Sequence, residues 1–230
     1  MMIKHYLKVA FRNLAKYKVQ SIVSILGLAV GFVCFALSTL WIRYEMTYDT
    51  FHEGAERIYL VRAHYAHEPG KISNSTPYPL ADYLQKGNPE IEAMASTSVQ
   101  KVKFRVKDTE KDVVSATADS VLMNFFNIRV LRGTVNFLKG TNGEIAITEE
   151  FSKRIFGEEE ALGREVEVSG HASKVGAIVS GWSSHSNIPY SILTSARHYT
   201  QWGSANENLF VRIRKGTNGE EFQKKIAALR

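Results

Sequence analysis

The hydrophobic pattern divides the chain into one long apolar segment and a much longer mixed region. Residues 21–42 read SIVSILGLAVGFVCFALSTLWI and contain no charge. A bilayer core of ~30 Å needs about 20 helical residues, whereas a core helix of a soluble domain carries polar residues on one face every turn. A cleaved signal peptide would have a shorter apolar region, roughly 7–15 residues, and a small-residue cleavage site. The segment is therefore predicted to be a transmembrane helix.

The 20 residues before this segment have the pattern of an amphipathic helix. Apolar residues recur at helical spacing on one side of residues 2–17, and cations gather on another side. Such a basic helix is typical of the membrane interface. We predict that residues 1–20 form a cytoplasmic interfacial elbow helix that contacts lipids, and a simple topogenic signal is the alternative. The residues assigned to the interface are Lys4, Lys8, Phe11, Arg12 and Lys16.

Gly27 and Gly31 form a G-x-x-x-G pair inside the apolar run. Small residues four positions apart let a second helix approach closely. Glycine is common in membrane helices, so a chance pair is the alternative. The predicted role of the pair is helix packing.

After residue 43 the pattern mixes strands and helices. Residues 101–107, KVKFRVK, alternate strictly between apolar and cationic positions, which predicts a half-buried strand, and 111–118 follow as its hairpin partner. Residues 144–148 indicate a strand, and 149–157 a helix capped by Thr148 and closed by Gly157. The remaining expected strands are 57–65, 164–168, 173–180 and 208–216, and the remaining expected helices are 76–88, 120–126 and 218–230. The predicted fold class is α+β.

Charge fixes the expected orientation. The chain holds 29 Lys and Arg against 23 Asp and Glu, and five of the cations lie in the first 20 residues, which carry no acid. The rest is therefore nearly balanced, at 24 cations (29 − 5) against 23 acids. The positive-inside rule places the N-terminus in the cytoplasm and the residues beyond about 43 outside it. The basic character is explained by topology and lipid headgroups, so no nucleic-acid partner is expected.

The sequence offers no recognisable catalytic arrangement. Gly70-Lys71 lacks the first glycine of a phosphate loop, and GWSSHS at 181–186 lacks the second glycine of a nucleophile elbow. The histidines at 171, 185 and 198 are too scattered for a metal motif. One cysteine, Cys34, excludes an intrachain disulfide. We expect no enzyme activity, no cofactor and no metal.

Several segments resemble FtsX/MacB-like ABC transporter permeases, especially the Bacteroidetes type. The resemblance begins with FRNL, continues through the glycine-bearing apolar helix to YEMTYDTFH, and reaches RIYLV at 57–61. Later segments at 125–134, 144–168 and 175–193 are similar to the periplasmic core domain of that family. The resemblance covers nearly the whole chain, and the order of the segments makes it specific although no single motif is chemically diagnostic.

The resemblance implies a two-lobed MacB-like periplasmic core domain after one N-terminal transmembrane helix. The implied parts are an elbow at 1–20, a transmembrane helix at 21–42, a connector at 43–57, a porter-like α/β lobe at 58–110 and 206–230, and an inserted, mixed β-rich Sabre-like lobe at 111–205. The implied function is that of a permease subunit in the bacterial inner membrane. It would couple ATP hydrolysis by a cytoplasmic ABC ATPase to motion of the periplasmic domain, for efflux or export of a periplasmic substrate, beside a second permease copy.

The chain departs from that family in one respect. The family has four transmembrane helices, whereas one is found here, so the chain is expected to be a fragment of the permease. The alternative function is a single-pass membrane-anchored binding or sensor module outside the cytoplasm. The residues do not choose the substrate, the oligomeric state or the partners outside the membrane.

Overall fold

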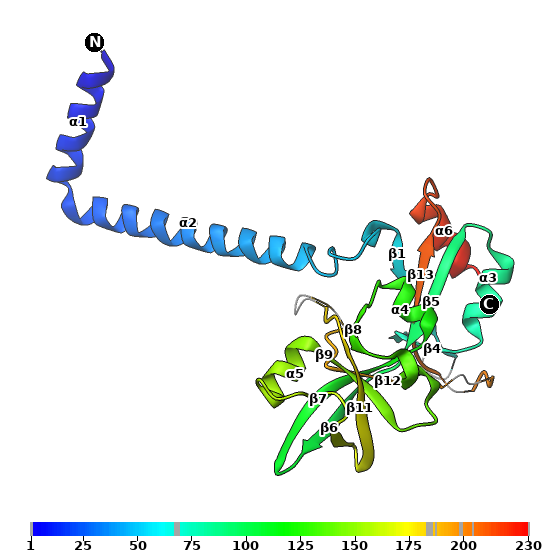
Figure 1. The fold of residues 1–230 in the computed structure, drawn as a ribbon. Coiled ribbons are helices and arrows are strands. Elements are labelled where there is room, and N and C mark those ends of the chain that lie inside the picture. The colour runs from blue at the N-terminus through cyan, green and yellow to red at the C-terminus, as the bar shows by residue number, and fades with distance from the viewer. Residues whose placement is uncertain are drawn as a thin grey trace. The chain divides into compact units, whose positions relative to one another are not determined.

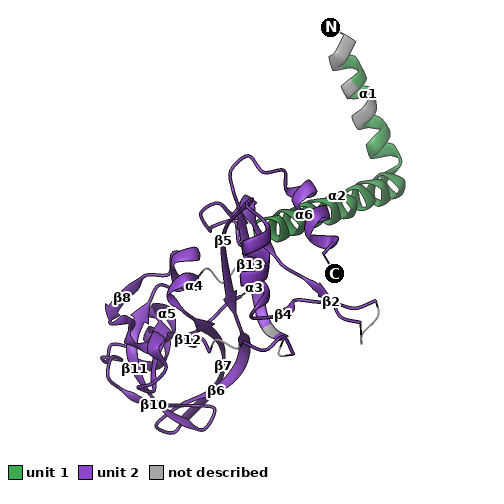
Figure 2. Cartoon of the chain, turned by 90° about the vertical axis from the view of Figure 1, so that its right-hand side faces the viewer, with its two compact units in different colours: residues 1–48 green, residues 49–230 purple. Residues whose placement is uncertain are grey.

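A computed structural model describes residues 2–66, 70–182, 186, 188–197, 200–203 and 205–229, without the side chains of 2–4, 7, 10, 11 and 206. The chain forms two compact units, Met1–Tyr48 and Asp49–Arg230 (Figure 2).

The first unit consists of two consecutive helices, α1 (Met2–Lys16) and α2 (Lys18–Met46). Tyr17 separates them with a non-helical backbone (φ −103°, ψ 56°), and the Ser21 hydroxyl donates to the Leu14 carbonyl across the break at 3.1 Å. The apolar part of α2 has a mean hydropathy of 2.3, and none of its residues is buried. At ~1.5 Å per residue, its 29 residues are long enough to cross a bilayer.

In the second unit, seven strands form a sheet in which six of them close into a ring. The order is β10-β6-β7-β12-β9-β11-β8, and β10 also pairs with β11, which completes the ring (Figure 2). Two of the neighbouring pairs are parallel, β12 with β7 and β11 with β9. The strands are β6 (Val99–Val106), β7 (Thr109–Ala118), β8 (Val130–Gly133), β9 (Glu144–Thr148), β10 (Glu165–Val168), β11 (His171–Val179) and β12 (Ile192–Ser195).

The core of the ring follows from the alternation seen in the sequence. Val102 and Phe104 of β6 are buried, whereas the cation between them, Lys103, is exposed. The Phe104 ring packs edge-on against Phe151 of helix α5 (Glu149–Phe156), with ring centroids 5.0 Å apart. The Thr148 hydroxyl caps α5 by accepting from the Phe151 N–H, as predicted. Helix α5 therefore contributes directly to the core that β6 lines.

A smaller sheet of four strands is built around β13 (Ala205–Ile213). One side of β13 pairs with β1 and β4 along different halves, and the other side pairs with β5. Two helices, α3 and α6, pack against this sheet through Leu84 and Phe222 (Figure 1). The partner elements are β1 (Ile58–Leu60), β4 (Ser75–Pro77), β5 (Ile91–Thr97), α3 (Leu80–Gly87) and α6 (Gly219–Ala227).

Four short elements complete the unit: the two-stranded sheet β2 (Ala63–His64) and β3 (Ile72–Ser73), helix α4 (Ser120–Phe125), and the 3₁₀ turns η1 (Ala55–Arg57) and η2 (Val135–Lys139).

The predicted α+β class is confirmed, and some predicted boundaries are wrong. The strand expected at 57–65 is two short strands, β1 and β2, with different partners. The helix expected at 76–88 begins at Leu80, because Thr76 and Pro77 belong to β4. The Thr76 hydroxyl donates to the Glu207 carbonyl of β13, which favours the extended backbone there.

The division into lobes at 110 and 206 stays a prediction. Residues Asp49–Arg230 form one compact unit that contains both sheets. By sheet membership the seven-stranded part begins at Val99, because β6 pairs along its length with β7. Its last strand ends at Ser195, and β13 returns to the smaller sheet at Ala205.

Candidate functional site: the connector anchor

The segment after α2 joins that helix to the second unit along the chain. Helix α2 ends at Met46, where the Thr47 hydroxyl donates to the Tyr44 carbonyl at 2.9 Å. The helix thus includes the first four residues of the predicted connector. Residues 49–57 then lie in the second unit and lead into β1. We call Asp49, His52 and Arg57 the connector anchor, because each contacts a distant part of that unit.

His52 packs in an aromatic cage. Its ring centroid lies 4.2 Å from that of Phe51 and 4.8 Å from that of Phe126, and 4.8 Å from Trp182 in an edge-on geometry of 82°. Phe126 follows α4 and Trp182 follows β11. Edge-to-face and tilted packing at these distances is favourable for aromatic rings.

The cage continues into both sheets. Phe126 packs edge-on against Phe210 of β13 at 5.1 Å, which reaches the four-stranded sheet. Trp182 packs edge-on against Tyr190 at 4.9 Å, and the Tyr190 hydroxyl donates to the Ser180 carbonyl at 2.9 Å, next to the end of β11. Burial raises the pKa of Tyr190. A single connector side chain is therefore in contact with a cluster that spans the two sheets.

The surroundings of His52 favour a neutral ring. Burial lowers the pKa of His52 because the charged form loses water, and the nearby Arg212 guanidinium lowers it further. The Asp49 carboxylate opposes this effect but does not overcome it. Arg212 is itself held in place, with its guanidinium 4.5 Å from the Phe125 ring centroid and a hydrogen bond to the Phe125 carbonyl.

A second contact fixes the end of the connector. The Arg57 Nη1 donates to the Glu92 carboxylate of β5 at 2.5 Å and to the Ile213 carbonyl of β13 at 2.8 Å. The hydrogen bond from Arg57 lowers the pKa of Glu92. Gly54 precedes this turn with φ +71°, a left-handed conformation, and an added Cβ would lie 3.0 Å from Arg57 Nη2. Asp49 fixes the start of the connector by accepting a hydrogen bond from the Ser186 hydroxyl.

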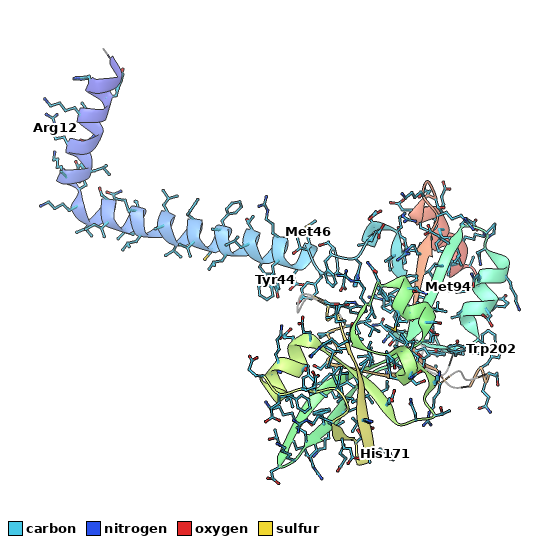
Figure 3. All side chains as sticks on the ribbon, in the orientation of Figure 1. Arg12, Tyr44, Met46, Met94, His171 and Trp202 are labelled. Carbon is cyan, nitrogen blue, oxygen red and sulfur yellow. The ribbon has the colours of Figure 1, made fainter. Side chains whose placement is uncertain are left out.

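The predicted membrane-associated residues lie in the first unit. Gly27 and Gly31 are on α2, and an added Cβ at either would meet nothing within 4 Å, so this face of the helix is open. Lys8, Arg12 and Lys16 are exposed on α1, where Figure 3 shows Arg12. The side chains of Lys4 and Phe11 lie outside the described residues. Their predicted roles at the interface, and that of the glycine pair in packing, stay predictions.

Within the described part of the chain, no three His, Cys, Asp or Glu side chains are placed to hold a metal ion together. His171 is exposed at the start of β11. Four other serines and histidines of the sequence analysis lie outside the described residues: Ser183, Ser184, His185 and His198.

Sequence reasoning missed the roles of His52, Arg57 and Trp182. The first two lie in YEMTYDTFHEGAERIY and the third in the GW at 181–182, segments that carried the family resemblance without a physical role. The two hydrogen-bond partners of Arg57 lie 35 and 156 residues away along the chain. Local periodicity could not reveal contacts at such separations. The signal that could have indicated these roles is the high content of aromatic residues in 44–52 and the tryptophan at 182, which lie outside the expected strands.

The model of the MacB-like periplasmic core domain family matches residues 21–229. Among proteins of curated function, none is similar enough in sequence to match.

Three solved structures are similar in fold. A domain described as part of a permease from Porphyromonas gingivalis is 18% identical, with a TM-score of 0.63, and the match covers 76% of this chain and 83% of that one. The extracellular domain of the noncanonic ABC-type transporter YknZ from Gram-positive bacteria is 15% identical, with a TM-score of 0.53 and coverage of 73% and 86%. The periplasmic region of MacB from Actinobacillus actinomycetemcomitans is 11% identical, with a TM-score of 0.52 and coverage of 74% and 79%.

The family match includes most of the apolar helix as well as nearly all of the second unit. The resemblance to FtsX/MacB-like permeases is thereby confirmed, and the chain belongs to the MacB-like periplasmic core domain family.

Proposed function

We propose that this chain is the N-terminal part of a permease subunit of an FtsX/MacB-type ABC transporter. The observation that carries the proposal is that one family match spans the membrane helix, the connector and the second unit as a continuous stretch. The YknZ structure is described as that of an ABC-type transporter, and it and the MacB structure share the fold of the second unit, which supports the same assignment.

In this proposal the chain itself does no nucleotide chemistry. A cytoplasmic ABC ATPase hydrolyses ATP, and the resulting movement of the membrane helices reaches the periplasmic domain through the connector. The domain then acts on a periplasmic substrate or partner, as in efflux or export. The connector anchor supports this mechanism, because His52 and Arg57 tie the segment after the membrane helix to both sheets.

The proposed topology places the N-terminus in the cytoplasm and the second unit in the periplasm. Five cations precede the apolar run, and the acids exceed the cations in residues 43–57. The exposed cations of α1 favour contact with anionic lipid headgroups. The open face at Gly27 and Gly31 favours packing against another transmembrane helix, either in the same permease or in a second copy.

The experiment that tests this function is purification of the tagged permease from its natural membrane together with its ATPase subunit. The complex should hydrolyse ATP, and substitution of the phosphate-loop lysine of the ATPase should abolish the activity. Reconstitution with the permease should change the ATPase rate relative to the ATPase alone. An ATPase that neither associates with the permease nor changes its rate would contradict the proposal.

A further inference from the structure

We propose that the neutral ring of His52 is a latch that couples the connector to both sheets, and that its protonation releases the connector. This inference rests on the proposed function for its consequence, the transmission of motion, but not for its structural content. The occupant of the cage is a side chain of the chain itself, so the latch requires no additional partner.

The geometry makes His52 the central contact between the connector and the rest of the unit. Its ring contacts Phe126 and Trp182 at 4.8 Å each, and these two rings contact each other edge-on at 4.9 Å. Phe126 leads to β13 through Phe210, and Trp182 leads to the segment before β12 through Tyr190. A pull on residue 52 is therefore passed to both sheets through rings in direct contact.

Arg57 cannot replace this contact. Its two hydrogen bonds reach Glu92 of β5 and the Ile213 carbonyl of β13, which both belong to the four-stranded sheet. Among the described contacts of the aromatic side chains of the connector and of Arg57, only those of His52 reach a residue that follows strand β11, namely Trp182. Without the His52 contact, the connector would keep the Arg57 bonds to the four-stranded sheet and the hydrogen bond that Asp49 accepts from Ser186, which also follows β11. The His52 contact differs from these bonds because it joins the two sheets through packed rings.

Protonation of His52 is opposed by its burial, because the charged ring loses water there. Phe51, Phe126 and Trp182 present aromatic carbon to the imidazole, and the indole Nε1 of Trp182 is buried with no acceptor among the described residues. The charged groups that act on His52 are Asp49 of the connector, which favours protonation, and Arg212 of β13, which opposes it. Burial and Arg212 outweigh Asp49 and lower the pKa of His52, so the latch is closed at neutral pH.

Trp182 is a built-in reporter of the latch. The chain has three tryptophans, so Trp41→Phe and Trp202→Phe leave Trp182 as the only source of indole emission in the intact protein. The emission is measured in detergent from pH 8 to pH 5. Opening of the cage on acidification should shift the emission to longer wavelength, in one transition with a midpoint below pH 6.5, the ordinary pKa of histidine.

Three variants separate the latch from simple packing. His52→Asn should give the long-wavelength emission at every pH, because the aromatic contact is lost. His52→Phe keeps the ring without a titratable group, so its emission should stay at short wavelength down to pH 5. His185→Asn is the matched control, because that histidine lies three residues from Trp182 in the sequence, and it should keep the transition.

If His52→Asn fails to fold, the proposal is still tested by the pH titrations of the protein with His52 intact and of the His52→Phe variant. A wild-type titration without a transition, or a transition that persists in His52→Phe, would overturn it. In the complete transporter, nucleotide-dependent movement of the domain should be lost in His52→Asn and kept in His52→Phe. If the permease associates with no ATPase, the proposed function fails, but the fluorescence result still tests the latch. If transport is coupled to ATP hydrolysis but the fluorescence transition is absent, the latch fails and the proposed function stands.

Discussion

Replacing Phe104 by alanine should strongly destabilise the second unit. The Phe104 ring is 1% exposed and lies in the core that includes Phe151 and buried aliphatic side chains of the ring of strands. Truncating a buried phenylalanine to alanine costs about 3–5 kcal/mol, from lost apolar burial and the cavity that remains. Of this, about 0.5–1.5 kcal/mol is the edge-on pair with Phe151, 5.0 Å away.

Thermal unfolding of the intact chain in detergent measures this cost. For a unit of this size, 1 kcal/mol corresponds to about 2–4 °C, so the melting temperature should fall by roughly 6–20 °C. Near-ultraviolet circular dichroism is the suitable signal, because it follows packed aromatic rings and not the membrane helix. A cycle with Phe151→Ala and the double variant should give less than additive losses, by about 0.5–1.5 kcal/mol.

Lys103→Ala is the matched control in the same strand. Lys103 points to the other face of β6, where it is exposed and pairs with Glu110 at 2.7 Å. Exposed ion pairs contribute little to stability, so this variant should melt close to the wild type. Equal melting temperatures for Phe104→Ala and Lys103→Ala would refute the assignment of β6 as a half-buried strand of the ring.

Three further predictions concern topology, helix packing and pH. In a chain whose native cysteine is replaced by serine, an impermeant maleimide should label Lys103→Cys in intact spheroplasts but Lys8→Cys only after permeabilisation; the reverse pattern would contradict the orientation. Gly27→Leu with Gly31→Leu should weaken association of the membrane helix in a transmembrane dimerisation assay, and unchanged association would exclude the packing role. Burial, with a smaller effect of Asp119, raises the pKa of the Glu207 carboxyl. The native state therefore holds the carboxyl proton more tightly than the unfolded state, and it loses stability as pH rises above about 4.5. Glu207→Gln should therefore melt higher at pH 7 with a flatter pH dependence, whereas a lower melting temperature at pH 7 would show that the ionised carboxylate is stabilising.

The parts of the fold that could be predicted are those in which local pattern and burial agree. The alternation in 101–107 gave the buried face of β6, and Thr148 and Gly157 marked the ends of α5 because capping is a local interaction. The uncharged run at 21–42 lies within α2, because a long apolar run without a helix breaker is a local helix signal, and its length suits a membrane span.

The parts that were missed depend on distant contacts. Strand β12 has four residues, too few for a periodic signal, and is buried because it lies between β7 and β9. Closure of the ring through β10 and β11 likewise depends on pairings that no local pattern encodes. The His52 cage brings together residues 51–52, 126 and 182, so its physical role becomes visible only when the chain is folded.

The claim that the periplasmic domain moves with the nucleotide state of a partner ATPase is tested most directly by a distance measurement within that domain. Spin labels at Lys86→Cys on α3 and Asp108→Cys in the turn between β6 and β7 report on the two sheets from exposed positions, once the native cysteine is replaced by serine. In the complete transporter, the distance distribution between the labels should differ between the nucleotide-free and ATP-bound states. Identical distributions in both states, in a complex that hydrolyses ATP, would contradict transmission of motion between the sheets of this domain.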